Sequence, residues 1–318
     1  MTPPRSSRLL VILAFAAVYL LWGSTYLAIR YAIETLPPFL MAAMRFLIPG
    51  GILFTWATLN GETIRTSFSQ WPKAFVIGAL LLLVGNGGVT WAEKHIASGL
   101  TALLIATEPL WVVIWNWTLS RKRPNAMVLF GVLIGLAGVG LLVSDGWNGV
   151  NGESSMNLAG AGVVLVAASA WAGGSVYSNR RPIKASTSMA AGMQMLAGGS
   201  LLVLLALIAG NFQGLNLNNA SWVSIAAFFY LIVFGSLIGY TAYSWLLRNV
   251  TPARAATYAY VNPVVAVLLG WFIAREPLTA RILIAAAVIV SSVILITTFG
   301  HEPATTVPDS ECPTPPCT

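Results

Sequence analysis

The chain has 318 residues, of which 57% are hydrophobic and only 8% are charged, and its formal net charge is +7. Because soluble domains carry about 25% charged residues, this composition excludes a globule covered by water. Apolar runs of roughly 17–25 residues, the length that crosses a bilayer, recur along the chain. A porin-like barrel would instead alternate in segments of about ten residues, and the basic residues lie in short loops rather than in a stripe suited to nucleic acid. We therefore expect an all-α membrane protein.

Proline, glycine, asparagine and charged residues divide the chain into apolar segments. The first segment follows Arg5 and Arg8, as a signal peptide would. It is too long for one, shows no small-residue cleavage pattern and leads into another span, so we expect it to be retained. Ten transmembrane helices are predicted, at residues 9–30, 38–59, 74–92, 98–119, 127–144, 158–178, 187–209, 222–246, 255–274 and 281–299.

Ten is an even number, so both termini should lie on the same side of the membrane. Basic residues gather on the cytoplasmic side of such proteins. Twelve lie on the amino-terminal side, namely Arg5, Arg8, Arg65, Lys73, Arg121, Lys122, Arg123, Arg180, Arg181, Lys184, Arg248 and Arg254. Four lie on the opposite side, namely Arg30, Lys94, Arg275 and Arg281. We expect both termini to be cytoplasmic.

The sequence repeats itself at half its length. "MAAMRFLIPGG" from Met41 resembles "MAAGMQMLAGG" from Met189, and "WGSTY" at Trp22 has a looser counterpart, "WAGGSVY", at Trp171. A second set recurs 154 residues later: Gly85, Trp91, Pro109 and Arg121 match Gly239, Trp245, Pro263 and Arg275. The chain thus divides into a first five-helix repeat at 1–150 and a second at 151–300.

Because each half contains an odd number of helices, the second repeat should enter the membrane from the opposite side. Inverted repeats with interrupted helices at matching places are typical of alternating-access carriers. A duplication that gave only a symmetric, inert bundle is the alternative. Residues 301–318 are rich in proline and threonine, and we expect them to form a disordered cytoplasmic tail in which Cys312 and Cys317 bind no metal and form no disulfide.

Several segments resemble the EamA-domain drug/metabolite transporters over about residues 10–299. They are "WGSTYLAIRYA", "HIASGLTALLIATEPLW" and "NVTPARAATYAYVNPVVAVLLGWFIAREPLT". The resemblance implies a bacterial inner-membrane permease for small metabolites, commonly an exporter, and within the family the chain is similar to the YddG-type exporters of aromatic and other amino acids. The first half departs from the family pattern at Arg121-Lys122, where an acidic residue is often expected and where the second half has Arg275-Glu276.

Two charged residues, Arg45 and Glu108, lie well inside predicted spans. A charge at the bilayer centre costs at least about 2.5–3.5 kcal/mol, so such residues usually face a cavity or a partner. At a rise of about 1.5 Å per residue, their depths should differ by only about 5 Å. They form either a structural ion pair or a substrate site in which Arg45 holds a carboxylate and Glu108 orients Arg45 or meets an ammonium group. As the deepest carboxylate in the sequence, Glu108 is also the candidate proton site.

Two prolines and two glycines at matching places are candidate hinges. Pro109 and Pro263 each remove a helix hydrogen bond, and the freed carbonyl then needs another partner in lipid. Gly85 and Gly239 allow helices to pack closely or to slide. We expect Pro109 and Pro263 to interrupt their helices beside the substrate pathway.

Aromatic and amide side chains near these interruptions are the remaining candidates for substrate binding. Tyrosine and tryptophan can cover an apolar ligand and still offer a hydrogen bond. The candidates are Trp22, Tyr26, Asn86, Trp91, Trp111, Trp171, Tyr240, Tyr243, Tyr258 and Asn262.

No sequence motif indicates catalysis, a nucleotide, a metal or another cofactor, because "GNGGV" lacks the lysine of a phosphate loop and no His/Cys cluster occurs. We therefore expect a non-enzyme whose partners are a small-molecule substrate, lipid and protons as the candidate coupling ion. Two transport alternatives are a multidrug exporter of cationic amphiphiles and a channel. An intramembrane enzyme is the alternative from another class.

Overall fold

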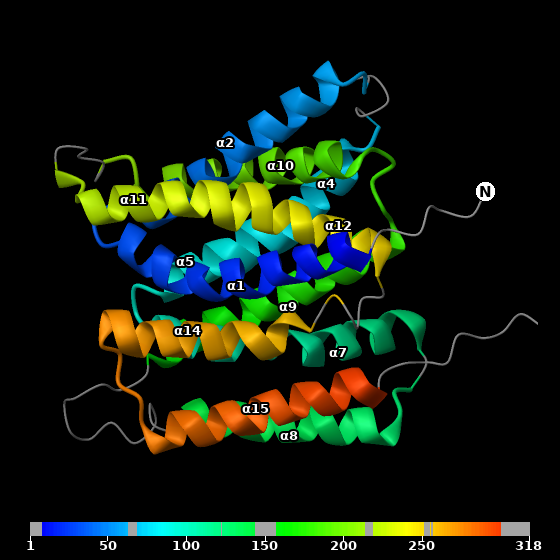
Figure 1. The fold of residues 1–318 in the computed structure, drawn as a ribbon, viewed down its shortest axis with the longest axis vertical. Helices are drawn as coiled ribbons and strands as arrows, with labels where there is room; N and C mark the ends of the chain where they lie inside the picture. Colours follow the sequence, from blue (N-terminus) through cyan, green and yellow to red (C-terminus); the bar gives the residue numbers. More distant parts are fainter. Residues whose placement is uncertain are drawn as a thin grey trace, which may run out of the picture.

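The structure is a computed structural model that describes residues 8–62, 69–121, 123–143, 157–213, 219–250, 255 and 257–299. Within these ranges, every regular element is a helix (Figure 1). The predicted tail at 301–318, with its two cysteines, lies outside the described residues.

The described helices run in the following order. They are α1 (Arg8–Ala32), α2 (Pro38–Leu59), α4 (Trp71–Gly78), η1 (Ala79–Asn86), α5 (Gly87–Ala92), α6 (Ser98–Ile105), α7 (Glu108–Ser120), α8 (Ala126–Val143), α9 (Leu158–Arg180), α10 (Thr187–Ile208), α11 (Trp222–Tyr230), η4 (Leu231–Tyr240), α12 (Thr241–Asn249), α14 (Tyr258–Ala274) and α15 (Ala280–Phe299).

The all-α membrane class is confirmed. Seven helical segments of the described chain are long and apolar enough to cross a membrane. Three further apolar helices, Ala126–Leu142, Val261–Ala274 and Ala280–Ile296, are shorter and fall at other predicted spans. The count of ten spans therefore stays a prediction.

The third and eighth predicted spans both contain a π-helical stretch. In the first half η1 lies between α4 and α5, and in the second half η4 lies between α11 and α12. A π-helix widens the turn and shifts the hydrogen-bonding partners, and such stretches often occur at functional sites. The two stretches contain Gly85 and Gly239, the glycines that the repeat had already matched.

The two candidate hinge prolines occupy different local structures. A turn at Ala106 and Thr107 separates α6 from α7, and Pro109 lies in the first turn of α7, where its missing N–H leaves no gap. Pro263 lies inside α14, which continues without a break. The helix is therefore interrupted beside Pro109 and continuous through Pro263, and the role of either proline as a hinge stays a prediction.

Helices of the two halves pack in matching pairs. α2 packs against α10 and α8 against α15, so equivalent helices meet (Figure 1). α1 packs against α14 and against the α11–η4–α12 segment, whereas α9 packs against the equivalent α6–α7 and α4–η1–α5 segments. The first helix of each half thus packs into the other half, as a pair of related repeats would require.

Backbone geometry repeats as well. Within the described residues, the non-glycine residues with positive φ are Arg121 (56°) and Arg275 (53°), each of which follows the end of a helix, α7 or α14. They are 154 residues apart, the spacing of the repeat. A left-handed residue commonly ends a helix, although glycine usually supplies it. The two halves therefore end equivalent helices in the same unusual way.

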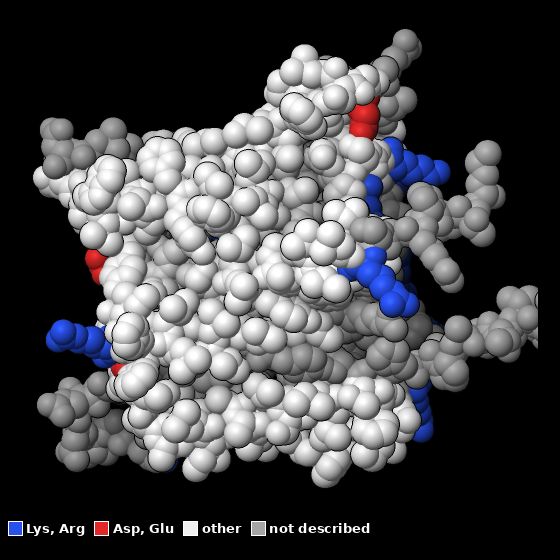
Figure 2. Space-filling view, viewed as in Figure 1, with Lys and Arg blue, Asp and Glu red and all other residues white. Residues whose placement is uncertain are grey.

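Charged residues lie at the ends of the bundle rather than on its sides. The face shown in Figure 2 is mostly uncharged across its middle, and most of its blue side chains lie at the end where the N-terminus lies. We call this the amino-terminal end and the opposite one the distal end. Large apolar side chains such as Trp56, Leu133 and Phe272 are exposed along the sides, as contact with lipid requires.

Close backbone contact between α2 and α10 depends on glycine. A Cβ at Gly50 would lie 2.8 Å from the Met195 Cβ and 3.1 Å from the Leu196 backbone nitrogen. A Cβ at the neighbouring Gly51 would meet nothing within 4 Å.

Gly50→Ala should therefore lower the unfolding free energy by about 1–3 kcal/mol, the usual effect of overpacking. Gly51→Ala, in the same helix, is the matched control and should leave stability unchanged or raise it by up to about 1 kcal/mol. Thermal unfolding of both purified variants in detergent measures this. Equal midpoints for the two variants would contradict the packing argument.

Candidate functional site

A central cavity lies where the helices of the two halves meet. The space in which the centre of a water molecule can lie has a volume of about 60 Å³. Its walls come from α1, α2, η1, α5, α6, α9, η4 and α14. Among the predicted site residues, those that line it are Trp22, Tyr26, Arg45, Gly85, Asn86, Trp171, Tyr240 and Tyr258.

A second, larger cavity lies toward the amino-terminal end. Its volume, measured in the same way, is about 330 Å³. Its lining includes Asn179, Pro182 and Arg248 near the ends of α9 and α12. Tyr240 lines both cavities. We call this space the proximal cavity, because it faces the end of the bundle where the N-terminus lies.

Four aromatic rings that contact one another edge to face or at a tilt lie where the linings of the two cavities meet. Trp22, Trp171 and Tyr258 line the central cavity, whereas Tyr243 lines the proximal one. The ring centroids of Trp22 and Tyr243 are 4.9 Å apart, and those of Trp22 and Trp171 are 5.5 Å apart, edge to face. We call these four rings the aromatic layer. Such pairs add about 0.5–1.5 kcal/mol each beyond their burial.

The glycines of the repeat make room for the aromatic layer. A Cβ at Gly239 would lie 2.6 Å from the Trp22 Nε1, and a Cβ at Gly85 would lie 3.0 Å from the Trp171 Cε3. Each tryptophan therefore packs on a glycine of the other half. Trp22 also donates a hydrogen bond from Nε1 to the Gly235 carbonyl in the π-helical stretch, at 3.0 Å. These contacts give Gly85 and Gly239 a packing role, and their role as hinges stays a prediction.

Arg45 is buried in the wall of the central cavity. Its Nε donates a long hydrogen bond of 3.5 Å to the Ser236 Oγ, and its guanidinium lies 4.8 Å from the centre of the Phe46 ring. Its Nη1 has no hydrogen-bond partner among the described residues. A buried guanidinium without a full set of partners is costly, so an anionic group in the cavity would find an unused donor here.

Glu108 begins α7 and is also buried, beside the aromatic layer. The Tyr258 hydroxyl donates a short hydrogen bond to its Oε2. The first turn of α7 adds the positive end of a helix dipole, which stabilises a carboxylate. The break after α6 therefore explains why the chain accepts both Glu108 and Pro109 at this place.

Arg45 and Glu108 do not pair. The structure describes both side chains and gives no ion pair between them, and α2 packs against α10, η4 and α5 rather than against α7. Similar depth therefore did not make the two residues neighbours, and the structural ion pair considered from the sequence is wrong for this conformation.

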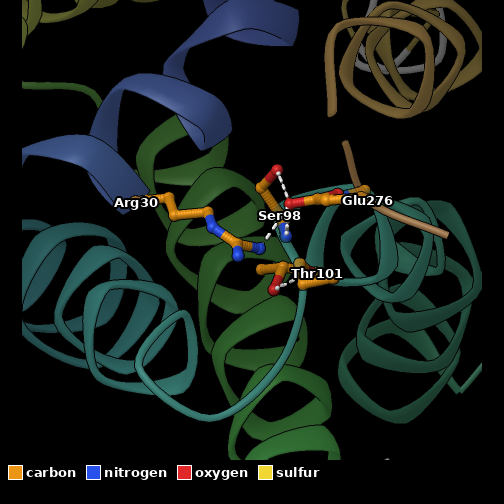
Figure 3. Close-up of polar contacts among 6 residues, drawn as sticks. Arg30, Ser98, Thr101 and Glu276 are labelled. Carbon is orange, nitrogen blue, oxygen red and sulfur yellow. Dashed lines mark hydrogen bonds and ion pairs between the residues drawn. The ribbon is translucent and has the colours of Figure 1, made fainter. Parts of the chain in front are cut away.

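The ion pair that the described residues do form lies at the distal end (Figure 3). Arg30 Nη1 at the end of α1 lies 2.6 Å from Glu276 Oε1, in the turn after α14. The same carboxylate accepts hydrogen bonds from the Ser98 backbone N–H (2.9 Å), the Ser98 Oγ (2.7 Å) and the Gly99 N–H (3.0 Å) at the start of α6. We call Arg30, Ser98, Gly99 and Glu276 the distal cluster. It joins the two halves at the distal end.

Sequence reasoning missed two buried carboxylates, so Glu108 is not the only one available. Glu276 is 7% exposed in its side chain and Glu93 is 5% exposed overall. Both follow the end of an apolar helix and stand beside a basic residue, which is typical of a solvated loop. Only the three-dimensional contacts show that these turns fold back onto the bundle.

Five predicted substrate-binding residues do not line the central cavity: Glu108 and Tyr243, described above, and Trp91, Trp111 and Asn262. Trp91 packs on His95, with ring centroids 4.5 Å apart. Trp111 and Asn262 each have a buried polar atom without a hydrogen-bond partner in the described part of the chain, but neither residue lines the cavity. The described residues also hold no group of three or more potential metal ligands.

A bundle of apolar helices with a polar and aromatic cavity between two related halves is an architecture found in membrane transporters. The chain belongs to the EamA-like transporter family, whose model matches residues 9–144 and 158–298, one stretch in each predicted half. The family predicted from the sequence is confirmed.

Two relatives and one solved structure illustrate the relationship. The chain is 39% identical to the inner membrane transporter YedA of Escherichia coli (strain K12) over 285 residues, 89% of each chain. It is 26% identical to the transporter YoaV of Bacillus subtilis (strain 168), covering 92% of this chain and 98% of that one. A crystal structure with 23% identity shares the fold, with a TM-score of 0.66 over 93% of this chain and 99% of that chain. The predicted membrane location is confirmed, and YedA is named for the inner membrane.

Glu276→Ala should lower the unfolding free energy by about 2–4 kcal/mol, because the Ser98 and Gly99 N–H groups lose their acceptor and Arg30 loses its partner. Glu34→Ala removes an exposed carboxylate near the same end of α1 and should change stability by less than about 0.5 kcal/mol. Denaturant unfolding in detergent compares them. A Glu276→Ala protein as stable as Glu34→Ala would show that the distal cluster contributes nothing.

Proposed function

We propose that the protein is an alternating-access carrier that exports amino acids or similar small metabolites from the cytoplasm, as a uniporter or with protons. The observation that carries this proposal is the unused Nη1 donor of Arg45 in a central cavity walled by aromatic rings. A guanidinium recognises a carboxylate, and the rings suit an apolar or aromatic side chain.

The arrangement of the cavities supports this function. The central cavity is separated from the proximal cavity by the aromatic layer and from the distal end by the distal cluster. Two closures on opposite sides of one site are what alternating access requires. Because the larger cavity lies at the amino-terminal end, which we propose to be cytoplasmic, the conformation is closer to loading from the cytoplasm than to release.

The repeat supports a rocking motion of two inverted five-helix halves, 1–150 and 151–300. The first helix of each half packs into the other half, so a change at one closure is passed across the central cavity. In this proposal Pro109 and the break after α6 absorb a change of helix direction. Pro263, inside an unbroken helix, bends α14 without interrupting it.

The substrate class is tested best by counterflow in proteoliposomes, with amino acids and common metabolites as a panel. Arg45→Ala should weaken the binding of substrates that carry a carboxylate about 10- to 100-fold, since a hydrogen bond to a charged group contributes about 1.5–3 kcal/mol. Arg45→Lys should keep part of the affinity because it keeps the charge but not the planar fork.

Arg181→Ala is the control for the loss of one basic side chain, since Arg181 is exposed in the loop after α9. It should leave transport unchanged. An unaltered affinity in Arg45→Ala would assign that residue to structure alone.

The second candidate is a multidrug exporter of cationic amphiphiles, with Glu108 as the partner of the cation. Burial of Glu108 beside the aromatic layer favours it, but the guanidinium of Arg45 in the same wall opposes a cationic ligand. Toxicity assays in cells separate the two, because an amino-acid exporter protects against toxic amino-acid analogues and a drug exporter against dyes such as ethidium. Protection against dyes alone would overturn the amino-acid proposal.

A further inference from the structure

Glu93 is a buried carboxylate that forms no ion pair with a described residue, although the Arg30 backbone lies close enough to favour its ionised form. It follows the last residue of α5 and is 5% exposed, yet neither of its oxygens accepts a hydrogen bond from any described residue. Burying an unpaired carboxylate is so costly that the group generally takes up a proton instead. Glu93 therefore needs a proton or another positive charge.

The position of Glu93 links the central cavity to the distal cluster. Asn86 and Val89 line the cavity, and Glu93 continues the same helical face one turn further. The charges of Arg30 and Glu276, both in the distal cluster, act on Glu93, as does the charge of Arg45 in the cavity wall. Glu93 thus stands between the site that we propose for the substrate and the closure of the distal end.

The elements packed against α5 bring few other titratable groups. α2, which packs against α5, contributes Arg45, and Tyr26 and Arg30 of α1 lie close enough for their charges to interact with Glu93. The titratable residues of α9 are Tyr177 and Arg180, in its last turn at the amino-terminal end, and η1 has none. Lys94 and His95 follow in the same turn as Glu93.

The hydrogen bonds are divided unequally among the three buried carboxylates. Glu276 accepts four, counting the ion pair with Arg30, and Glu108 accepts one from Tyr258, whereas Glu93 accepts none. The charges of Arg30 and Arg45 both act on Glu93, but Arg30 is already paired with Glu276, whose negative charge opposes the ionisation of Glu93. The carboxylate without donors is the one at which a proton is most stabilising.

We propose that Glu93 is a proton-binding site that controls the distal closure, loaded from the side of the membrane opposite the N-terminus. With Glu93 protonated, Arg30 stays on Glu276 and the distal end is closed. With Glu93 ionised, a second carboxylate competes for Arg30, and opening the distal end brings Glu93 into water. The Arg30 side chain is 36% exposed, so a proton has a short path to this site. The link to export rests on the proposed function, but the site itself does not.

The direction of the pH dependence follows from the two conformations. Burial and the Glu276 charge raise the pKa of Glu93 well above its usual range, against the opposing charges of Arg45 and Arg30. In an open distal end, a solvated Glu93 would return toward about 4.3. The closed conformation therefore binds the proton more tightly, so acid favours closure and a rise in pH favours opening.

Labelling of a buried position tests this without any substrate. Cys312→Ser and Cys317→Ser remove the native thiols, and Ile29→Cys places one thiol in the central cavity, at a residue that is 2% exposed and adjacent to Arg30. A membrane-impermeant maleimide is applied from the distal side. Glu34→Cys, at an exposed residue near the same end, corrects for the pH dependence of the reaction itself.

The labelling ratio of Ile29→Cys to Glu34→Cys should rise on the order of tenfold between about pH 5 and about pH 8, a typical coupling of two sites. Adding Glu93→Gln should hold the ratio at its low acid value at every pH, because Gln imitates the protonated carboxyl. Glu108→Gln is the matched control and should keep the full pH dependence.

Three outcomes would overturn the proposal: a wild-type ratio that does not change with pH, an unchanged pH dependence in Glu93→Gln, or its loss in Glu108→Gln alone. If size-exclusion chromatography shows that the Glu93→Gln protein is not folded, the Glu93→Asp protein replaces it. The shorter carboxylate should keep a pH dependence with a displaced midpoint, and an undisplaced midpoint would overturn the proposal. A protein that transports no amino acid would leave the labelling result intact, so this test and that of Arg45 fail separately.

Discussion

The Glu276 carboxylate holds together three segments that are far apart in the chain. It binds Arg30 at the end of α1 and the Ser98 and Gly99 N–H groups at the start of α6, and it lies in the turn after α14. Backbone donors in an apolar environment have no water to replace such an acceptor. Because these contacts join the first half of the chain to the second, one side chain supports both the cohesion of the halves and the distal closure. Opening that end requires another acceptor, either water or a second carboxylate.

The centre of the bundle is held by neutral contacts. Trp22 and Trp171 occupy corresponding places in the repeat, and each packs on a glycine of the other half, Gly239 or Gly85. The two rings also touch each other, edge to face. The boundary between the halves therefore passes through the aromatic layer, so relative movement of the halves would change these ring contacts. This is why the residues that mark the repeat in the sequence are also the residues of the central site.

The internal repeat and the residue types predicted much of this arrangement, because both can be read directly from the sequence. Trp22 and most of the other rings named from the sequence line the central cavity, and the break next to Pro109 follows from its missing N–H. The sequence could not show that Arg45 and Glu108 do not pair, because depth in the membrane gives one coordinate and leaves open which helices are neighbours. Glu93 was missed because a carboxylate next to Lys94 at a helix end is usually solvated, and only the three-dimensional packing shows that this one is buried.

The two closures differ in their chemistry although the backbone repeats. When the two repeats are aligned, the charged residues at the distal end correspond to uncharged or basic residues at the amino-terminal end. Arg30 aligns with Asn179, Glu93 with Leu247 and Glu276 with Lys122. The amino-terminal closure has the aromatic layer instead. Ring contacts respond to the shape of a ligand and little to pH, whereas an ion pair with a buried carboxylate responds to a neighbouring charge. In the proposed carrier, a substrate that enters from the amino-terminal side would therefore act first on the rings, and a proton from the other side would act first on the charges.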